Sequence, residues 1–145
     1  MLLRMLPEQI AAHWDRLEGP IASTLPPIAG EAPDKMNNVL ESLLASGLQL
    51  WLSYTKTDKV EVSGLVVTQI IADTATKTLS LLIYSVYSEN GTSDQEWAEG
   101  FMALRKYAKS KGCTRIVGYT NVPQILKRVE QFGGDASWSF ISFNV

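Results

Sequence analysis

The sequence predicts an α/β (α+β) fold in which helices cover both faces of a central mixed β-sheet. Two observations lead to this prediction. Apolar residues recur at helical spacing up to Gly47, and strand-like runs rich in β-branched and aromatic residues replace them between residues 48 and 87. From Ser93 onward the order becomes helix, strand, helix and closing strand. Strands joined by short turns pair antiparallel, whereas strands joined through a helix pair parallel.

Two amphipathic helices are predicted in the first third of the chain. Between Pro7 and about Leu25 the apolar residues fall at spacings of four, three and four, namely Ile10, Trp14, Leu17 and Ile21. Gly19-Pro20 is expected to end or bend this helix. Asp34 is expected to cap a second helix that closes at Gly47. The inward residues of this second helix are Met36, Val39, Leu40, Leu43 and Leu44.

Three strands are predicted in the middle of the chain, at Leu48–Tyr54, Val60–Ile71 and Thr78–Tyr87. Short polar turns separate them, which indicates an antiparallel meander. Gly64 lies where a bulge or bend is expected. The third strand is almost continuously apolar, as in strands that are buried on both faces, so we expect it at the centre of the sheet.

The last third of the chain predicts two capped helices around a short strand. Ser93 and Glu96 have the spacing of a capping box, and the helix that follows carries Trp97, Phe101, Leu104 and Ala108. The strand Thr114–Tyr119 is expected beside the central strand and parallel to it. Asn121 is expected to cap the second helix, with Pro123 in its first turn. Serines lie between the aromatic residues of a predicted closing strand, which are Trp138, Phe140 and Phe143.

Length and composition restrict the class of protein. The chain has 145 residues, of which 46% are hydrophobic and 19% charged, so a single domain spanning residues 1–145 is expected. A net charge of −2 gives no electrostatic reason to expect nucleic acid. The basic residues between Arg105 and Arg115 are interpreted as a solvated helix face, with a nucleic-acid-binding accessory role as the weaker alternative. No apolar run reaches membrane-spanning length, and the opening apolar residues are too few for a signal sequence.

The scarcity of cysteine and histidine argues against a metal site. Cys113 is the single cysteine and His13 the single histidine, and no cluster of Cys, His and Asp has the spacing of metal ligands. At the start of a strand, Cys113 is interpreted as a small buried hydrophobe, with a nucleophile as the alternative. One cysteine excludes an internal disulfide, which fits a reducing compartment, so a cytoplasmic protein is expected.

The element order resembles that of the GCN5-related N-acetyltransferase (GNAT) superfamily. The resemblance covers nearly the whole chain, and its most similar local pattern is Asn121 followed by a helix that ends in Gln131-Phe132-Gly133-Gly134. The compact chain also resembles short acetyltransferase-like proteins of bacteria and phages. The resemblance implies an acyl-CoA-dependent N-acetyltransferase, in which an amine of a small molecule or protein attacks the thioester of acetyl-CoA directly.

The resemblance also implies where acetyl-CoA binds. In the family, the pantetheine arm lies between two central strands that separate, which here correspond to Leu79–Tyr87 and Thr114–Tyr119. The pyrophosphate lies on backbone amides at the start of the following helix, because free N–H groups and the helix dipole attract phosphate. Here that loop is Glu89-Asn90-Gly91-Thr92-Ser93. The implied cofactor-binding residues are Val86, Gly91, Thr92, Ser93 and Asn121.

The loop departs from the family pattern in two ways. It has one glycine, Gly91, and no basic residue, where the family has a basic residue or Gln and two spaced glycines. Three carboxylates, on Glu89, Asp94 and Glu96, are expected near the helix start and would repel phosphate. The alternative hypothesis is therefore a catalytically inactive GNAT-like binding or accessory module that has lost the pyrophosphate loop.

The catalytic candidates are Tyr87, Tyr119 and Glu89. The family tends to place a tyrosine general acid on the late helix, where this chain has Arg128 and Val129. A phenol at the end of a central strand can protonate a departing thiolate, and Glu89 can accept the proton of an amine directly or through water. The structural alternatives are tyrosines that cap the core and a solvated Glu89. A homodimer formed through the closing strand and simple completion of the sheet are both open.

Overall fold

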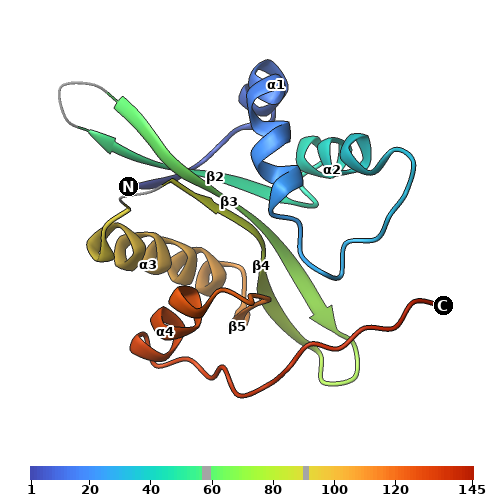
Figure 1. Ribbon diagram of the computed structural model, residues 1–145, viewed down its shortest axis with the longest axis vertical. Coiled ribbons are helices and arrows are strands. Elements are labelled where there is room, and N and C mark those ends of the chain that lie inside the picture. Colours follow the sequence, from blue (N-terminus) through green and yellow to red (C-terminus); the bar gives the residue numbers. More distant parts are fainter. Residues whose placement is uncertain (57–59, 90–91) are drawn as a thin grey trace.

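The computed structural model describes residues 1–56, 60–89 and 92–145. Five strands form one sheet in the order β1-β2-β3-β4-β5 (Figure 1). The strands are β1 (Leu2–Arg4), β2 (Gln49–Lys56), β3 (Val60–Asp73), β4 (Thr78–Ser88) and β5 (Cys113–Gly118), and the helices are α1 (Pro7–Ser23), α2 (Lys35–Leu44), α3 (Asp94–Ser110) and α4 (Pro123–Gln131). The pairs from β1 to β4 are antiparallel and the pair β4–β5 is parallel. The predicted mixed sheet, its meander and its parallel pair are confirmed.

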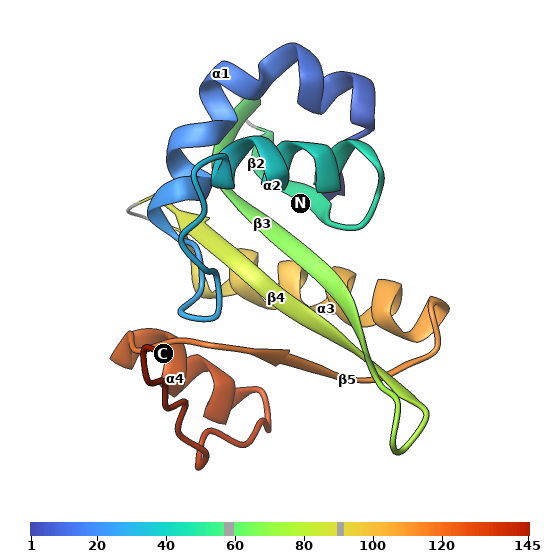
Figure 2. The same cartoon turned by 90° about the vertical axis from the view of Figure 1, so that its right-hand side faces the viewer.

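Alternate residues of the central strands divide the core between the two faces of the sheet. Leu50 of β2 and Val67 of β3 pack with α1 and α2, whereas Trp51 and Val66, one residue away, pack with α3. Figure 2 shows α1 and α2 together on one side of the sheet and α3 on the other. The prediction of helices on both faces is therefore confirmed. Within the described ranges, no helix is long and apolar enough to cross a membrane.

Most of the predicted inward residues of α1 and α2 form the core of their layer, but the prediction is wrong for Leu44, which is exposed. Ile10, Leu17 and Ile21 of α1 are buried, and so are Val39 and Leu43 of α2. The prediction that Gly19-Pro20 ends or bends α1 is wrong. The helix continues to Ser23, and its irregular backbone lies at His13 instead.

Two bulges interrupt the regular pairing of β3. In the β2–β3 ladder the partners move from Ser53–Gly64 to Tyr54–Val62, which leaves Ser63 as an extra residue beside the predicted position Gly64. In the β3–β4 ladder Thr68 pairs with Ile83 and Val67 pairs with Ser85, which leaves Tyr84 extra. A bulge changes which face the later side chains occupy. Ser85 and Tyr87 consequently face α1 and α2.

The predicted closing strand is absent from the structure. Residues 135–145 are extended without strand pairing, and Trp138 and Phe143 are 89% and 86% exposed. A strand requires hydrogen bonds to a neighbouring edge. The aromatic contact of this segment is that of Phe140 with Tyr119, at 5.0 Å between ring centroids, and one side-chain contact does not align two backbones.

The first strand, β1, was not predicted. Leu3 pairs with Leu52 of β2, and the Met5 amide donates to the Leu50 carbonyl at 2.8 Å. A strand of three residues is too short to show an alternating pattern. It adds Leu2 to the core between the sheet and α3.

Candidate active site

β5 is paired with β4 up to its last residue, and the chain leaves β4 where β5 ends. Their parallel pairing ends at Ile83 and Gly118, and β4 continues to Ser88 paired with β3. Tyr84, the bulged residue, directly follows the last pair, so the bend that a bulge introduces lies where the two strands part. Figure 2 shows β4 and β5 diverging from their common end. The separation implied by the family resemblance is present at this point.

Beyond Ile83, where the pairing with β5 ends, some backbone groups of β4 point away from β3 toward an edge that no longer has a strand partner. The Glu89 amide donates to the Ser63 carbonyl of β3 at 2.9 Å. Because the peptide groups of an antiparallel strand alternate in direction, those of Val86 and Ser88 point away from β3. No strand in the described part of the chain pairs with this edge beyond Ile83. The peptide group of Val86 is thus oriented to bond an extended ligand.

The first turn of α3 retains backbone donors that a ligand can use. The Ser93 hydroxyl accepts from the Glu96 amide at 3.2 Å, which is the predicted half of the capping box. The reciprocal bond from Glu96 to the Ser93 amide is not formed, and Glu96 Oε2 is buried without a partner among the described residues. The amides of Asp94 and Gln95 likewise have no acceptor in the described ranges. With the positive end of the helix dipole, these amides favour an anion.

Hydrogen bonds join Thr92, just before α3, to Ser88 and Glu89 at the end of β4. The Thr92 hydroxyl donates to the Glu89 carbonyl at 3.0 Å and lies 2.7 Å from the Ser88 hydroxyl. The Glu89 side chain itself is exposed. Gly91, predicted to approach the pyrophosphate, lies outside the described residues, as does Asn90. Thr92 therefore fixes the end of β4 close to the start of α3.

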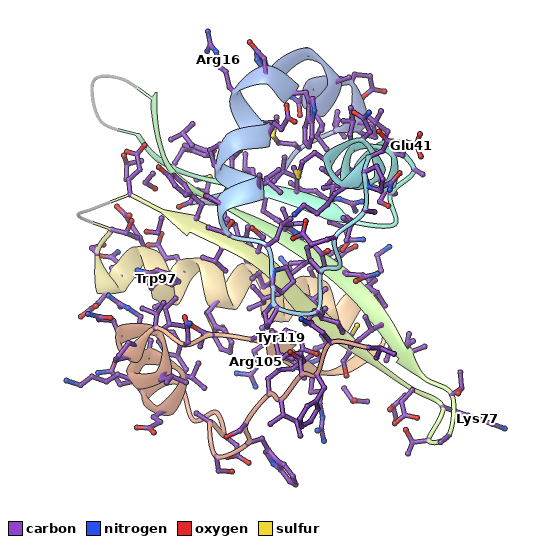
Figure 3. All side chains as sticks on the ribbon, turned by 45° about the vertical axis from the view of Figure 1, so that its right-hand side comes forward. Arg16, Glu41, Lys77, Trp97, Arg105 and Tyr119 are labelled. Atoms are coloured by element: carbon purple, nitrogen blue, oxygen red, sulfur yellow. The ribbon has the colours of Figure 1, made fainter. Side chains whose placement is uncertain are left out.

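A cation that the sequence reasoning missed lies at the start of α3. Arg128 of α4 donates to Asp94 at 2.5 Å, and its guanidinium carbon lies 5.1 Å from the ring centroid of Trp97. The Arg128 side chain is only 23% exposed, so it is shielded between the two helices. Figure 3 shows Trp97 on α3 beside α4. A positive charge from another part of the chain thus lies at the start of α3, where it is paired with Asp94.

A sequence signal for this contact exists in the spacing of two residue pairs. Trp97 and Phe101 are four apart on α3, and Arg128 and Phe132 are four apart at the end of α4. Phe101 stacks on Phe132 at 5.1 Å between centroids, next to the contact of Trp97 with Arg128. Residues four apart occupy one helix face. The matching spacings could have indicated that these two faces meet.

The three carboxylates expected to repel phosphate do not act together. Asp94 is paired with Arg128. Glu96 lines a cavity of about 370 Å³ on the side of β2, whose other lining residues are Met1, Tyr54, Thr55, Ser93, Gln95 and Glu99. Glu89 lies on the loop with its side chain exposed to solvent, where charges are screened. The ion pair thus offsets one of the three expected repulsive charges, whereas the Glu96 carboxylate stays in the first turn of α3 without a partner among the described residues.

The structure separates the two candidate tyrosines. Tyr119, labelled in Figure 3, directly follows the last residue of β5. It is 38% exposed and meets Phe140 edge to face. Tyr87 packs against the core beneath α1 and α2 because the bulge at Tyr84 turns it to that face. Tyr119 is thus the more accessible phenol at the parting of the strands. Glu89 lies two residues beyond Tyr87, at the end of β4.

Asn121 is exposed and does not cap α4, so the predicted cap is wrong. Pro123 occupies the first turn of the helix, which puts Val122 at the capping position. The Val122 amide instead donates to the Thr120 hydroxyl at 3.1 Å. The Asn121 side chain makes no hydrogen bond within the described residues, so it remains available to a ligand.

Tyr84 was not singled out from the sequence because an apolar run does not reveal a bulge. Its ring packs against the core under α1 and α2. Burial raises the pKa of the Tyr84 phenol above its ordinary value, and the nearby Lys35 cation opposes this rise. The neighbouring Ser85 is buried and its hydroxyl bonds that of Thr24 on α1. The bulge thus ties β4 to the α1 layer.

The chain is similar over its whole length to solved structures of acetyltransferases. One is AAC(6')-Iy in complex with the bisubstrate analogue CoA-S-monomethyl-acetylneamine, with 16% identity, a TM-score of 0.68, and coverage of 100% of this chain and 97% of the other. Another is a ribosomal-protein-alanine N-acetyltransferase from Brucella melitensis biovar Abortus 2308, with 15% identity, a TM-score of 0.67, and coverage of 100% and 99%. A third is an aminoglycoside acetyltransferase, meta-AAC0020, from an uncultured soil metagenomic sample in complex with sisomicin, with 11% identity, a TM-score of 0.70, and coverage of 100% and 94%.

The fold is that of the GNAT acetyltransferases. No protein-family model matches the sequence, and no curated protein matches it either, so the likeness lies in the fold. The GNAT features that this chain has are the antiparallel meander, the parallel pair β4–β5 and the helices on both faces of the sheet. Beyond Ile83, β4 continues to Ser88, whose hydroxyl lies 2.7 Å from that of Thr92 just before α3.

Proposed function

We propose that this chain is an acyl-CoA-dependent N-acetyltransferase, and that residues 1–145 act as one domain. The observation that carries the proposal is the separation of β4 from β5 at Ile83 and Gly118, beside a helix start with available amides. An extended ligand with a phosphate group at one end fits such an arrangement, because a strand edge bonds the extended part and a helix start binds the anion. Acetyl-CoA has this shape and charge.

The residues present fit both parts of acetyl-CoA, the extended pantetheine arm and the negatively charged pyrophosphate. The peptide group of Val86 would bond the pantetheine arm, and the first-turn amides of α3, next to Thr92 and Ser93, would hold the pyrophosphate. Arg128 lies at that helix start and would add a positive charge. Gly91 and Asn121 remain further proposed contacts. Bound there, acetyl-CoA supplies an activated acetyl group for transfer.

The reaction requires two proton movements, and this chain offers a group for each. The attacking amine must lose a proton, which the exposed carboxylate of Glu89 can accept directly or through water. The departing thiolate must gain a proton, which a phenol can donate. We assign this role to Tyr119 because its ring is exposed beyond the last strand pair. Tyr87 is the second candidate, and its position in the core favours a structural role.

We propose a small-molecule amine as the acceptor. One structural neighbour is an aminoglycoside acetyltransferase in complex with sisomicin, and another is in complex with a CoA-S-monomethyl-acetylneamine bisubstrate analogue, which supports this class of acceptor. A protein amine is the other candidate, since a third neighbour is a ribosomal-protein-alanine N-acetyltransferase. We also propose a cytoplasmic location, which the single cysteine supports because an internal disulfide is excluded.

Calorimetric titration of the full chain with acetyl-CoA and with CoA tests the proposal. We expect saturable binding with a dissociation constant in the range of roughly 1 μM to 1 mM that is usual for enzyme substrates. ADP, which lacks the pantetheine arm, is the matched control and should bind more weakly. Absence of binding at millimolar CoA would overturn the proposal. Transfer itself is measured as thiol release with panels of aminoglycosides, polyamines and peptide amines, with the background from Cys113 subtracted.

A further inference from the structure

The positive charge of this chain is concentrated in one segment. Between Phe101 and Val129 the sequence has seven basic residues and no acidic one, although the whole chain has a net charge of −2. The segment comprises the later part of α3, all of β5 and most of α4. The net charge of the whole chain, which gave no reason to expect nucleic acid, therefore conceals a positively charged region.

The basic residues at the end of α3 are not neutralised by carboxylates of the described residues. Arg105, Lys106, Lys109 and Lys111 are exposed, and the ion pairs of the described ranges involve none of them. Arg105 and Lys109, four residues apart, share one helix face, where like charges repel. The helix dipole compensates for cations in the last turn only, and Arg105 and Lys106 lie before that turn. A bound anion would relieve this repulsion.

The ring of Tyr107 extends the positive surface from α3 to β1. The Arg4 guanidinium carbon lies 5.6 Å from the centroid of this ring, and Lys111 Nζ lies 5.8 Å from it. Trp51 of β2 contacts the same ring at 5.0 Å between centroids, which fixes the ring against the sheet. Attraction between cation and ring holds Arg4 beside the end of α3. The basic patch consists of Arg4, Arg105, Lys106, Lys109 and Lys111.

The basic patch is distant from the start of α3, where the pyrophosphate of CoA is proposed to bind. A helix rises about 1.5 Å per residue, so Lys106 lies roughly 18 Å along the axis from Asp94, and Lys111 roughly 26 Å. CoA bound at the first turn would therefore not neutralise the patch. The patch requires an anion of its own.

The composition of the patch favours a phosphate backbone over a protein surface as this anion. The centre of a protein interface is apolar, but every exposed residue from Arg105 to Lys111 is basic or is Ser110. The nearest exposed apolar residue of α3 is Met102, which precedes the patch. Lysine and arginine side chains bind the phosphates of nucleic acids without reading their sequence. We propose that the basic patch binds the phosphate backbone of a nucleic acid, DNA or RNA, independently of sequence.

Fluorescence anisotropy of the full chain with labelled oligonucleotides of about 20 nucleotides tests the proposal. Single-stranded DNA, duplex DNA and RNA are compared, and the one that binds most tightly identifies the source of the phosphates. Four phosphate contacts from the end of α3 predict that the logarithm of affinity falls with the logarithm of salt concentration at a slope of about −4 on duplex DNA. Affinity should thus fall roughly 100-fold between about 50 and 200 mM salt.

Arg105→Gln and Arg16→Gln form a matched pair of variants, because each removes one exposed arginine from a helix. In Figure 3, Arg105 lies on α3 and Arg16 on α1, which packs on the other face of the sheet. Arg105→Gln should weaken binding about tenfold at about 50 mM salt and make the slope shallower by about one. The double variant K106Q/K109Q should make it shallower by about two. Arg16→Gln should change neither quantity, and all variants should keep the far-ultraviolet circular dichroism of the wild type.

Four outcomes would overturn the proposal. These are no binding at about 50 mM salt, an affinity that does not depend on salt, and an equal loss of affinity in Arg105→Gln and Arg16→Gln. The fourth is competition by poly-glutamate as effective as that by nucleic acid, which would show that the patch binds an acidic protein segment. Saturating CoA should leave nucleic-acid binding unchanged, and displacement by CoA would likewise contradict a separate site. The nucleic-acid titrations are carried out without CoA, so their outcome is independent of the proposed activity.

Discussion

Arg128 and Asp94, separated by 34 residues in sequence, form an ion pair that joins α4 to the first turn of α3. If CoA binds at this helix start, the pair places both an attractive and a repulsive charge near its phosphates. Asp94→Asn should then tighten CoA binding, and Arg128→Gln should weaken it. Because Asp94 is solvent-exposed, we expect each change to be about fivefold.

Calorimetry of CoA with these two variants measures the effect, and Lys127→Gln is the matched control. Lys127 is exposed on the same helix and is not paired with Asp94. The Lys127→Gln substitution removes one positive charge, as Arg128→Gln does, and should leave the dissociation constant for CoA unchanged. Wild-type affinity in Arg128→Gln would show that Arg128 does not contact the phosphates, even if CoA binds to the protein.

Removing the Tyr119 hydroxyl should slow acetyl transfer without affecting substrate binding. A positioned general acid contributes roughly 100-fold or more to a rate, so Tyr119→Phe should lower kcat by about that factor with little change in KM. Tyr87→Phe is the comparison, because Tyr87 packs in the core under α1 and α2. Steady-state rates with the best amine from the panel decide between them. Equal losses in kcat for the two variants would remove the assignment of Tyr119.

Two glycines should respond in opposite ways to replacement by alanine. A Cβ at Gly64 would lie 2.5 Å from the Tyr87 carbonyl oxygen and 3.3 Å from the Ser88 Cα. Backbone atoms cannot yield as a flexible side chain does, so Gly64→Ala should destabilise the protein by about 1–3 kcal/mol. At Gly100, within α3, a Cβ meets no atom within 4 Å, and Gly100→Ala should stabilise by up to about 1 kcal/mol. Thermal unfolding of both variants checks the signs, and a neutral Gly64→Ala would contradict the tight packing of β3 on β4.

The buried phenol of Tyr84 should make the protein sensitive to alkaline pH. Its pKa is raised above the ordinary value of 10.0 by burial. Below that value the phenol is protonated in both the folded and the unfolded chain. Above it the unfolded chain ionises first, so stability falls as pH rises through the folded pKa. Urea unfolding between about pH 8 and pH 11 should show a smaller loss of stability for Tyr84→Phe than for the wild type.

A matched variant isolates the contribution of Tyr84 from those of the other tyrosines. Tyr119→Phe removes one phenol from the surface and serves as the control for the substitution itself. If the alkaline loss of stability is the same in Tyr84→Phe and in the wild type, burial of this phenol is not its cause.

Elements with a strong internal period could be predicted from the sequence. The spacing of Ile10, Leu17 and Ile21 indicated the buried face of α1, and the apolar run Thr78–Tyr87 indicated the position of β4 between its neighbours. The separation of β4 from β5 followed from the family resemblance. Each of these features depends on residues close in sequence or on the order of the elements, and both can be read from the pattern of apolar residues along the chain.

Features that depend on one distant contact or on one extra residue could not be predicted. The Tyr84 bulge leaves no mark in an apolar run, yet it decides which face Tyr87 occupies. The pairing of Arg128 with Asp94 required knowing how α4 lies on α3. The alternation around Phe140 predicted a closing strand that the structure does not have, because a strand also requires hydrogen bonds to a neighbouring edge, which the pattern of one segment does not report.

Helix α4 has nine residues and no buried side chain, so α3 is its main support. Isolated helices of this length are marginally stable in water. Here the stacking of Phe101 on Phe132 and the ion pair of Arg128 with Asp94 stabilise α4 against α3. We therefore expect α4 to open locally at a free energy well below that of global unfolding. Opening of α4 would then carry Arg128 away from the start of α3, while the five-stranded sheet stays intact.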